Sequence, residues 1–147
     1  MILQKRKRVS VNKAATLFLV AIKIKKETGE NYMKFEKKEQ EEIQEITGYS
    51  VDLGFSIMCN EKRVGHIFLN ELLTGDYFIE WIEIFPEYRK KGYCKQTLMN
   101  IMDYLEIDEI QLETNEDFVS MYLHLGAEKL DYDDIREMYL LRLRKMS

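Results

Sequence analysis

The chain has 147 residues, which is enough for one domain of ordinary size. Apolar residues make up 46% of it and aromatic residues 12%, so it can build a hydrophobic core, and this excludes a disordered chain. One proline and seven glycines exclude a collagen-like or low-complexity sequence. The two cysteines, Cys59 and Cys94, are too few for a disulfide framework or a zinc cluster. We therefore expect a cytoplasmic protein with reduced thiols and no metal.

Basic charge is concentrated at the start of a chain whose net charge is −4. Residues 1–26 carry eight basic side chains and no acidic one, so the remainder is strongly acidic. The basic run Lys5–Arg8 and the apolar stretch 14–22 are similar to a secretion signal, but lysines follow instead of a cleavage site. The stretch is also far shorter than the roughly 20 residues that span a bilayer. We predict a helix of the fold here, with no membrane partner, and nucleic-acid binding is disfavoured in so acidic a chain.

The first 48 residues are predicted to be mainly helical. Apolar residues at a period close to 3.6 indicate a first helix that begins near Ser10 or Asn12 and ends at the Thr28–Asn31 break. A second, highly charged helix is predicted over Glu36–Ile46 and stops before Gly48. The pattern leaves open whether residues 2–9 or 32–35 form a strand.

The middle of the chain changes to the two-residue period of strands. We predict strands over Val51–Ile57, Arg63–Leu72 and Tyr77–Phe85, joined by turns of hairpin length and therefore antiparallel. The last of the three is apolar on both faces apart from Glu80 and Glu83, which is typical of a central strand covered on both sides.

After Pro86 helical and strand patterns alternate. One predicted helix carries Leu98, Ile101, Met102 and Leu105 on one face. A short strand is predicted over Ile107–Glu113. A second helix carries Phe118, Met121, Tyr122 and Leu125 on one face, with Asn115 as its N-cap and Gly126 at its end. A final strand pair is predicted over Ala127–Leu130 and Met138–Arg144. The predicted fold class is therefore α+β, one domain over residues 1–147 with a mixed sheet flanked by helices.

The segment that joins the central strand to the next helix has the features of an anion site. A strand that ends near Ile84 leads into Arg89, Lys90, Lys91 and Gly92, and this loop opens a helix. Backbone N–H groups at a helix start attract phosphate, and glycine permits its close approach. An ordinary solvated loop is the alternative on these residues alone.

Order and spacing then add a resemblance. The run Arg89-Lys90-Lys91-Gly92-Tyr93-Cys94 resembles the Gln/Arg-x-x-Gly-x-Gly/Ala loop of the GNAT N-acetyltransferase superfamily, with Cys94 departing from the last position. The preceding Ile84-Phe85-Pro86-Glu87-Tyr88-Arg89 is similar to that family's Val-x-Pro-x-Tyr-Arg approach. Downstream, Asn115-x-x-Phe118-x-x-Met121-Tyr122 and Leu125-Gly126-Ala127 are similar to its Asn-x-x-Ala-x-x-Leu-Tyr and Leu-Gly-Phe elements. The resemblance is strong from Val51 to Arg144 and weak before residue 49.

The resemblance implies a GNAT-like, mostly antiparallel sheet that holds acetyl-coenzyme A where the central strand splays from the next strand. Backbone groups near Ile82 and Ile84 would pair with the pantetheine arm, and a backbone N–H of the same strand could stabilise the oxyanion. The loop Arg89–Cys94, through the amides of residues 91–94, would hold the pyrophosphate, and Asn115 could also contact the cofactor. A non-catalytic module of the same fold, binding coenzyme A or a protein partner, is the alternative.

An amine must lose a proton before it attacks a thioester, so a base is expected. Glu80 is the first candidate because the resemblance places an acid in this strand, and Glu113 is the second, since Leu112-Glu113 looks like the base position of ribosomal-protein alanine acetyltransferases. Glu83 is a third, predicted on the face opposite Glu80. Each could instead be a structural carboxylate.

Tyr122 corresponds to the family's proton donor to the departing thiolate, with a core tyrosine as the alternative. His66 and His124 are read as structural, Cys94 as a small packing residue, and Met99, Met102 and Met121 as core. The acceptor is expected to be an amine on a small molecule or protein, and the acidic balance favours a cationic one such as a polyamine, a lysine or a protein N-terminus. A homodimer is left open.

Overall fold

The computed structural model describes residues 33–145. The predicted N-terminal helix and the basic run before it lie outside this range. The elements in chain order are β1 (Met33–Lys37), α2 (Gln40–Thr47), β2 (Leu53–Cys59), β3 (Lys62–Glu71), β4 (Tyr77–Ile84), the 3-10 turn η2 (Pro86–Tyr88), α3 (Tyr93–Leu105), β5 (Glu109–Thr114), α4 (Glu116–His124), β6 (Glu128–Asp133) and β7 (Met138–Arg144).

Seven strands form one mixed sheet in the order β1-β2-β3-β4-β5-β7-β6. Its single parallel pair among the described strands is β4 with β5, and the other neighbours are antiparallel. The predicted α+β class and the antiparallel arrangement of β2, β3 and β4 are thus confirmed. Within residues 33–145, no helix is both long and apolar enough to cross a membrane.

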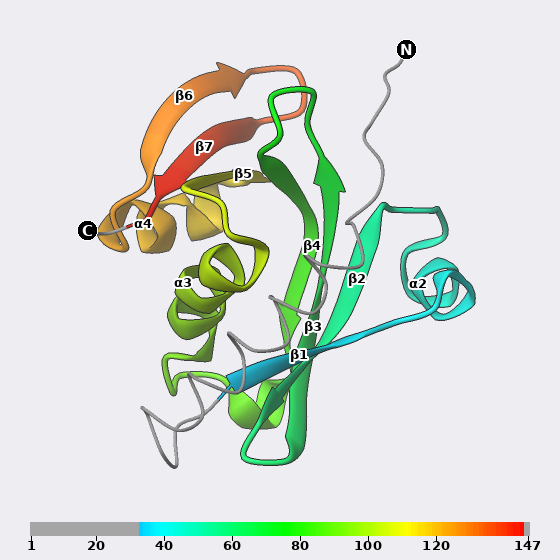
Figure 1. Cartoon of the computed structure of the whole chain (residues 1–147). Coiled ribbons are helices and arrows are strands. Elements are labelled where there is room, and N and C mark those ends of the chain that lie inside the picture. The colour runs from blue at the N-terminus through cyan, green and yellow to red at the C-terminus, as the bar shows by residue number, and fades with distance from the viewer. Residues whose placement is uncertain (1–32, 146–147) are drawn as a thin grey trace.

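The helices form two unequal layers, one on each side of the sheet. Figure 1 shows α3 and α4 on one side of the sheet and α2 on the other. The larger hydrophobic core lies under α3 and α4, where Leu98, Ile101 and Met102 are fully buried against Ile67 and Ile110 of the sheet. On the other side, a small core joins Ile43 of α2 to Val51 and Phe68, with Trp81 packed against it.

The start of the predicted helix over Glu36–Ile46 is wrong, because residues 36 and 37 belong to β1. Met33 and Phe35 are buried on one face of this strand, so the two-residue period holds here, and β1 pairs with β2. The helix begins only at Gln40, where the Glu39 N–H donates to the Glu42 carboxylate at 3.4 Å. Its predicted end is confirmed, since Gly48 caps α2 in the left-handed region at φ 85°.

The predicted apolar face of α4 is also wrong in part. Phe118 and Met121 are 56% and 41% exposed, so Met121 is not a core residue. Val119 and Tyr122 face the core instead. This helix carries apolar residues on more than one face. Their spacing alone therefore does not determine which face turns towards the core.

Candidate active site

The sheet opens between β4 and β5 at a backbone irregularity. These strands pair only over Tyr77–Ile79 and Ile110–Leu112, and the pairing ends there although both strands continue. On the other side of β4, Leu69 pairs with Ile79 but Phe68 pairs with Trp81, so Glu80 is the extra residue of a β-bulge. A bulge bends its strand and increases its twist, which explains why β4 departs from β5 at this position. The predicted splay between these strands is therefore present.

The loop after β4 is held by its own side chains. The Arg89 Nε donates to the Ile84 carbonyl at 2.7 Å, which folds the loop back onto the end of β4. The rings of Tyr88 and Tyr93 meet edge to face with centroids 6.4 Å apart. Burial is the main reason why the pKa of Tyr93 is raised, and Cys59 of β2 adds to this shift. The bond from Arg89 and the contact between the two rings tie the segment between β4 and α3 to its own ends.

The same loop presents backbone donors. Lys90 and Gly92 both lie in the left-handed region, at φ 65° and 82°, and Gly92 is the N-cap of α3. The first helical bond runs from the Gln96 N–H to the Gly92 carbonyl at 3.0 Å, so the amides of residues 93–95 precede it and need acceptors from outside the helix. Within the described chain, no side chain caps this helix. The helix dipole and the adjacent lysines make this end of α3 suitable for an anion.

A groove continues from the first turn of α3 towards the far end of α4. Its volume is about 540 Å³, and it is lined by Lys95, Met99 and Asp103 of α3, by residues 124–126 and by Lys145. The Lys145 ammonium contacts the Asp103 carboxylate at 2.6 Å, which raises the pKa of Lys145. His124 therefore lines a groove rather than the core. The groove begins one residue after Cys94 and so lies next to the loop amides.

Tyr122 lies on the helical side of the sheet and is 7% exposed. Its side chain belongs to the main hydrophobic core, against which Cys94 in the first turn of α3 also packs. Burial is the main reason why the pKa of Tyr122 is raised, and Cys94 adds to it, so the phenol is protonated at neutral pH.

Glu80 lies on the opposite side of the sheet from Tyr122. The Asn70 amide donates to its Oε2 at 2.8 Å, and the Asn70 Oδ1 in turn accepts the Asp52 N–H at 2.8 Å. The second bond fixes which end of the Asn70 amide faces Glu80. Sequence reasoning missed Asn70, because nothing in the pattern marks a partly exposed asparagine of β3 as a carboxylate partner.

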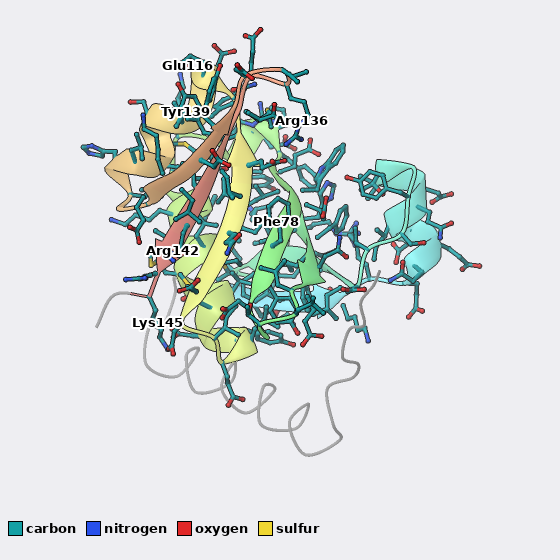
Figure 2. The ribbon with its side chains drawn as sticks, turned by 90° about the horizontal axis from the view of Figure 1, so that it is seen from above. Phe78, Glu116, Arg136, Tyr139, Arg142 and Lys145 are labelled. Carbon is teal, nitrogen blue, oxygen red and sulfur yellow. The ribbon has the colours of Figure 1, made fainter. Side chains whose placement is uncertain are left out.

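Glu113 is in a different situation from Glu80. Arg136, in the turn between β6 and β7, donates from Nη1 and Nη2 to its two oxygens at 3.0 and 2.5 Å. Arg136 also donates to Asp133 at 2.8 Å, and Glu113 and Asp133 together raise the pKa of the guanidinium. Figure 2 shows Arg136 at this end of the sheet. Sequence reasoning missed this partner, which is 23 residues away in the chain.

The prediction that Glu83 projects to the face opposite Glu80 is wrong. The Glu83 Oε1 pairs with the His66 Nε2 at 3.0 Å. The His66 ring stacks on Phe68, with the two ring centroids 5.0 Å apart. His66 lies on the same face of β3 as Asn70, the partner of Glu80. The bulge at Glu80 and Trp81 interrupts the alternation of β4, so that Glu80 and Glu83 lie on one face. Burial lowers the pKa of His66, and Glu83 opposes this shift.

The remaining predicted residues lie around the splay and at the start of α4. Ile84 is buried and Ile82 half-buried, both on the helical side of β4 beyond its pairing with β5. Asn115 is the N-cap of α4, as predicted, and its Oδ1 accepts the Asp117 N–H at 3.0 Å. Figure 2 shows Glu116 and Tyr139 side by side at this end of α4, where the Tyr139 hydroxyl donates to Glu116 at 2.6 Å.

The described residues contain no group of three or more histidine, cysteine or acidic side chains that could hold a metal ion. Both cysteines are free thiols. The site is therefore built from backbone amides, one carboxylate with a neutral partner and one buried phenol.

Comparison with known proteins adds a family. The sequence model of the acetyltransferase (GNAT) family matches residues 22–127. This match includes part of the region before residue 49, where the motif resemblance is weak. No curated protein matches the sequence.

Solved structures share the fold at low sequence identity. A Bacillus anthracis acetyltransferase with acetyl-coenzyme A bound superposes with a TM-score of 0.55 at 17% identity, over 64% of this chain and 63% of that one. The spermidine N-acetyltransferase of Vibrio cholerae, a dodecamer, gives 0.58 at 12% identity, over 77% and 94%. The ribosomal-protein-S18-alanine N-acetyltransferase of Escherichia coli gives 0.55 at 15% identity, over 78% and 96%.

Proposed function

Because the chain belongs to the acetyltransferase (GNAT) family, we propose that it is an N-acetyltransferase that moves an acetyl group from acetyl-coenzyme A directly to a primary amine. The observation that carries this proposal is the loop at the N-terminus of α3, whose first amides have no acceptor within the helix, at the end of the strand β4 that parts from β5. An anion site and an opening in the sheet are the two features that a phosphate-bearing, extended thioester needs.

The residues present fit coenzyme A as a ligand. The amides of residues 91–94 would hold its pyrophosphate, with charge from Arg89, Lys90 and Lys91. The β4 backbone near Ile82 and Ile84 no longer pairs with β5, so its polar groups are available to an extended amide chain, as in strand addition. The groove that starts at Lys95 is next to the loop and has room for the adenosine end.

Glu80 is the carboxylate best suited to accept a proton from an ammonium group. On the same face, Glu113 is paired with Arg136, Glu109 with Arg144 and Glu128 with Arg142. The recorded partner of Glu80 is instead the neutral amide of Asn70, and no ion pair involves Glu80 among residues 33–145. Its negative charge is therefore uncompensated by the described residues, and a cationic amine can supply the compensation.

Tyr122 is suited to the opposite role, because it holds a proton on the helical side of the same strands. Acetyl-coenzyme A supplies an acetyl group on a thioester: a C–N bond forms, the C–S bond breaks, and the electron pair stays on sulfur. The Tyr122 hydroxyl would give that sulfur its proton and recover one from the acetylated nitrogen. The proton that Glu80 removes from the ammonium passes to solvent, so protons balance.

The acceptor is proposed to be a cationic amine of a small molecule or a protein, acting in the cytoplasm. Glu80 provides the negative charge, and the half-buried rings of Phe78 and Trp81 flank it on β4. Among structural neighbours, one is named for spermidine and another for the alanine of a ribosomal protein, so the fold serves both kinds of acceptor.

Two measurements test the proposal. Calorimetry with coenzyme A should show binding, and a panel of polyamines, lysine derivatives and peptides should release free thiol from acetyl-coenzyme A. Glu80→Gln should reduce kcat/KM for the amine by about a hundredfold or more while cofactor affinity stays unchanged. Glu113→Gln is the matched control, since it removes a carboxylate from the same face. Absence of coenzyme A binding would refute the proposal, and binding without thiol release across the panel would favour the non-catalytic module.

A further inference from the structure

Thr114 is a buried polar side chain at the end of β5. It is 6% exposed, and the alternation of β5 places it on the same face as Ile110 and Leu112, which belong to the main hydrophobic core. Among residues 33–145, the structure records no hydrogen-bond partner for its hydroxyl. Buried hydroxyls are normally bonded, because an unpaired one costs free energy. Thr114 therefore keeps a polar group at a position where an apolar side chain would serve the fold.

The polar side chains on either side of Thr114 are already engaged. Both carboxylate oxygens of Glu113 accept hydrogen bonds from Arg136. The Oδ1 of Asn115 accepts the Asp117 N–H at 3.0 Å and so caps α4. At this end of β5, the Thr114 hydroxyl is thus the side-chain group that the described residues leave for an outside partner.

Thr114 lies where the sheet is open. The last pair of β4 and β5 is Ile79 with Leu112, and Thr114 comes two residues after it. On its other side β5 is still paired, with Thr114 opposite Tyr139 of β7. At Thr114 one edge of β5 therefore adjoins β7 and the other adjoins the gap between β4 and β5.

We propose that the Thr114 hydroxyl forms a hydrogen bond with an amide group of the pantetheine arm of coenzyme A. This inference rests on the proposed function. A hydroxyl can donate to an amide carbonyl or accept from an amide N–H, so it suits either group of the arm. Both partners are removed from water in the gap, and each supplies the bond that the other needs. The loop amides hold the pyrophosphate, and Thr114 recognises the arm.

Thr114→Val tests the contact, because it keeps the shape of the side chain and removes the hydroxyl. The melting temperature of the cofactor-free variant should stay the same or rise, since an unpaired hydroxyl adds no stability. Its coenzyme A affinity, measured by calorimetry, should fall about three- to tenfold, the size of one neutral hydrogen bond. Thr114→Ser, which keeps the hydroxyl, should bind more tightly than Thr114→Val. A lower melting temperature for Thr114→Val without cofactor would show that the hydroxyl is already bonded within the protein, and would overturn the inference.

ADP and a second threonine separate this contact from effects on the loop or the core. ADP carries a pyrophosphate without the arm, so its affinity should be the same for Thr114→Val as for the unaltered protein. Thr97, the other buried threonine of the described residues, lies on α3 and donates to the Met33 Sδ at 3.6 Å. Thr97→Val is the matched control and should leave coenzyme A affinity unchanged.

Three results would count against the contact. Equal losses of affinity for ADP and coenzyme A, or equal losses in the two threonine variants, would refute it. Unchanged coenzyme A affinity in Thr114→Val would refute it as well, and in all three cases the proposed function would stand. If the unaltered protein does not bind coenzyme A, both the contact and the proposed function are refuted.

Discussion

Gly92 allows a direct test of the anion site, because its φ of 82° separates backbone strain from steric conflict. A Cβ added there would have no atom within 4 Å among the described residues, so Gly92→Ala introduces no clash. A non-glycine residue in the left-handed region costs roughly 1–2 kcal/mol. The loop can relieve this strain by turning its amides away, and binding must then restore them. Coenzyme A affinity should fall about 5- to 30-fold by the conversion of that energy.

Gly75 provides the matched control in the turn between β3 and β4. Its φ is 95°, and an added Cβ would likewise have no atom within 4 Å in the described part of the molecule. Thermal unfolding should show similar destabilisation for Gly75→Ala and Gly92→Ala, and titration calorimetry should show lost coenzyme A affinity for Gly92→Ala alone. If the two variants bind coenzyme A equally well, the loop amides do not hold its pyrophosphate.

Three further predictions follow from the contacts of the site. Tyr122→Phe should lower turnover by at least about tenfold with acetyl-coenzyme A affinity nearly unchanged, measured by thiol release and calorimetry; unchanged turnover would remove its role as proton donor. Because burial lowers the pKa of His66 below its usual 6.5, the unfolded chain binds more protons between the folded pKa and 6.5, and the free energy of unfolding should fall as pH drops through this window. Denaturant titrations of His66→Gln should show a flatter dependence, and an unaltered slope would contradict this. Arg136→Gln should lower the melting temperature slightly and leave the amine kcat/KM within a few-fold, whereas a large loss would reinstate Glu113 as the base.

The strands β2 to β5 and the helix α3 could be predicted because the burial of their side chains follows directly from residue order. Phe55 and Ile57 alternate with residues of the other face, and Leu98, Ile101 and Met102 recur at helical spacing, so the hydrophobic pattern determines both elements. The same reasoning failed at Glu36 and Lys37, where a charged run was read as helix although Met33 and Phe35 already bury one strand face.

The candidate site was predicted less completely, since its side chains are set by contacts between distant residues. Asn70 meets Glu80 across two strands, and Arg136 reaches Glu113 from a turn 23 residues away. A single sequence has no local pattern that pairs such residues. The bulge at Glu80 has no marker either, because neither a glycine nor a proline lies in β4.

The bulge links the opening of the sheet to the placement of its base. The bulge at Glu80 bends β4 where its pairing with β5 ends, and the Glu80 side chain lies at this position beside Asn70, on the face away from α3 and α4. Tyr122 remains on the helical face, where it is buried in the main core. The proposed proton acceptor and the proposed proton donor therefore lie on opposite sides of the sheet, an arrangement that suits an amine entering from one side and a thiol leaving from the other.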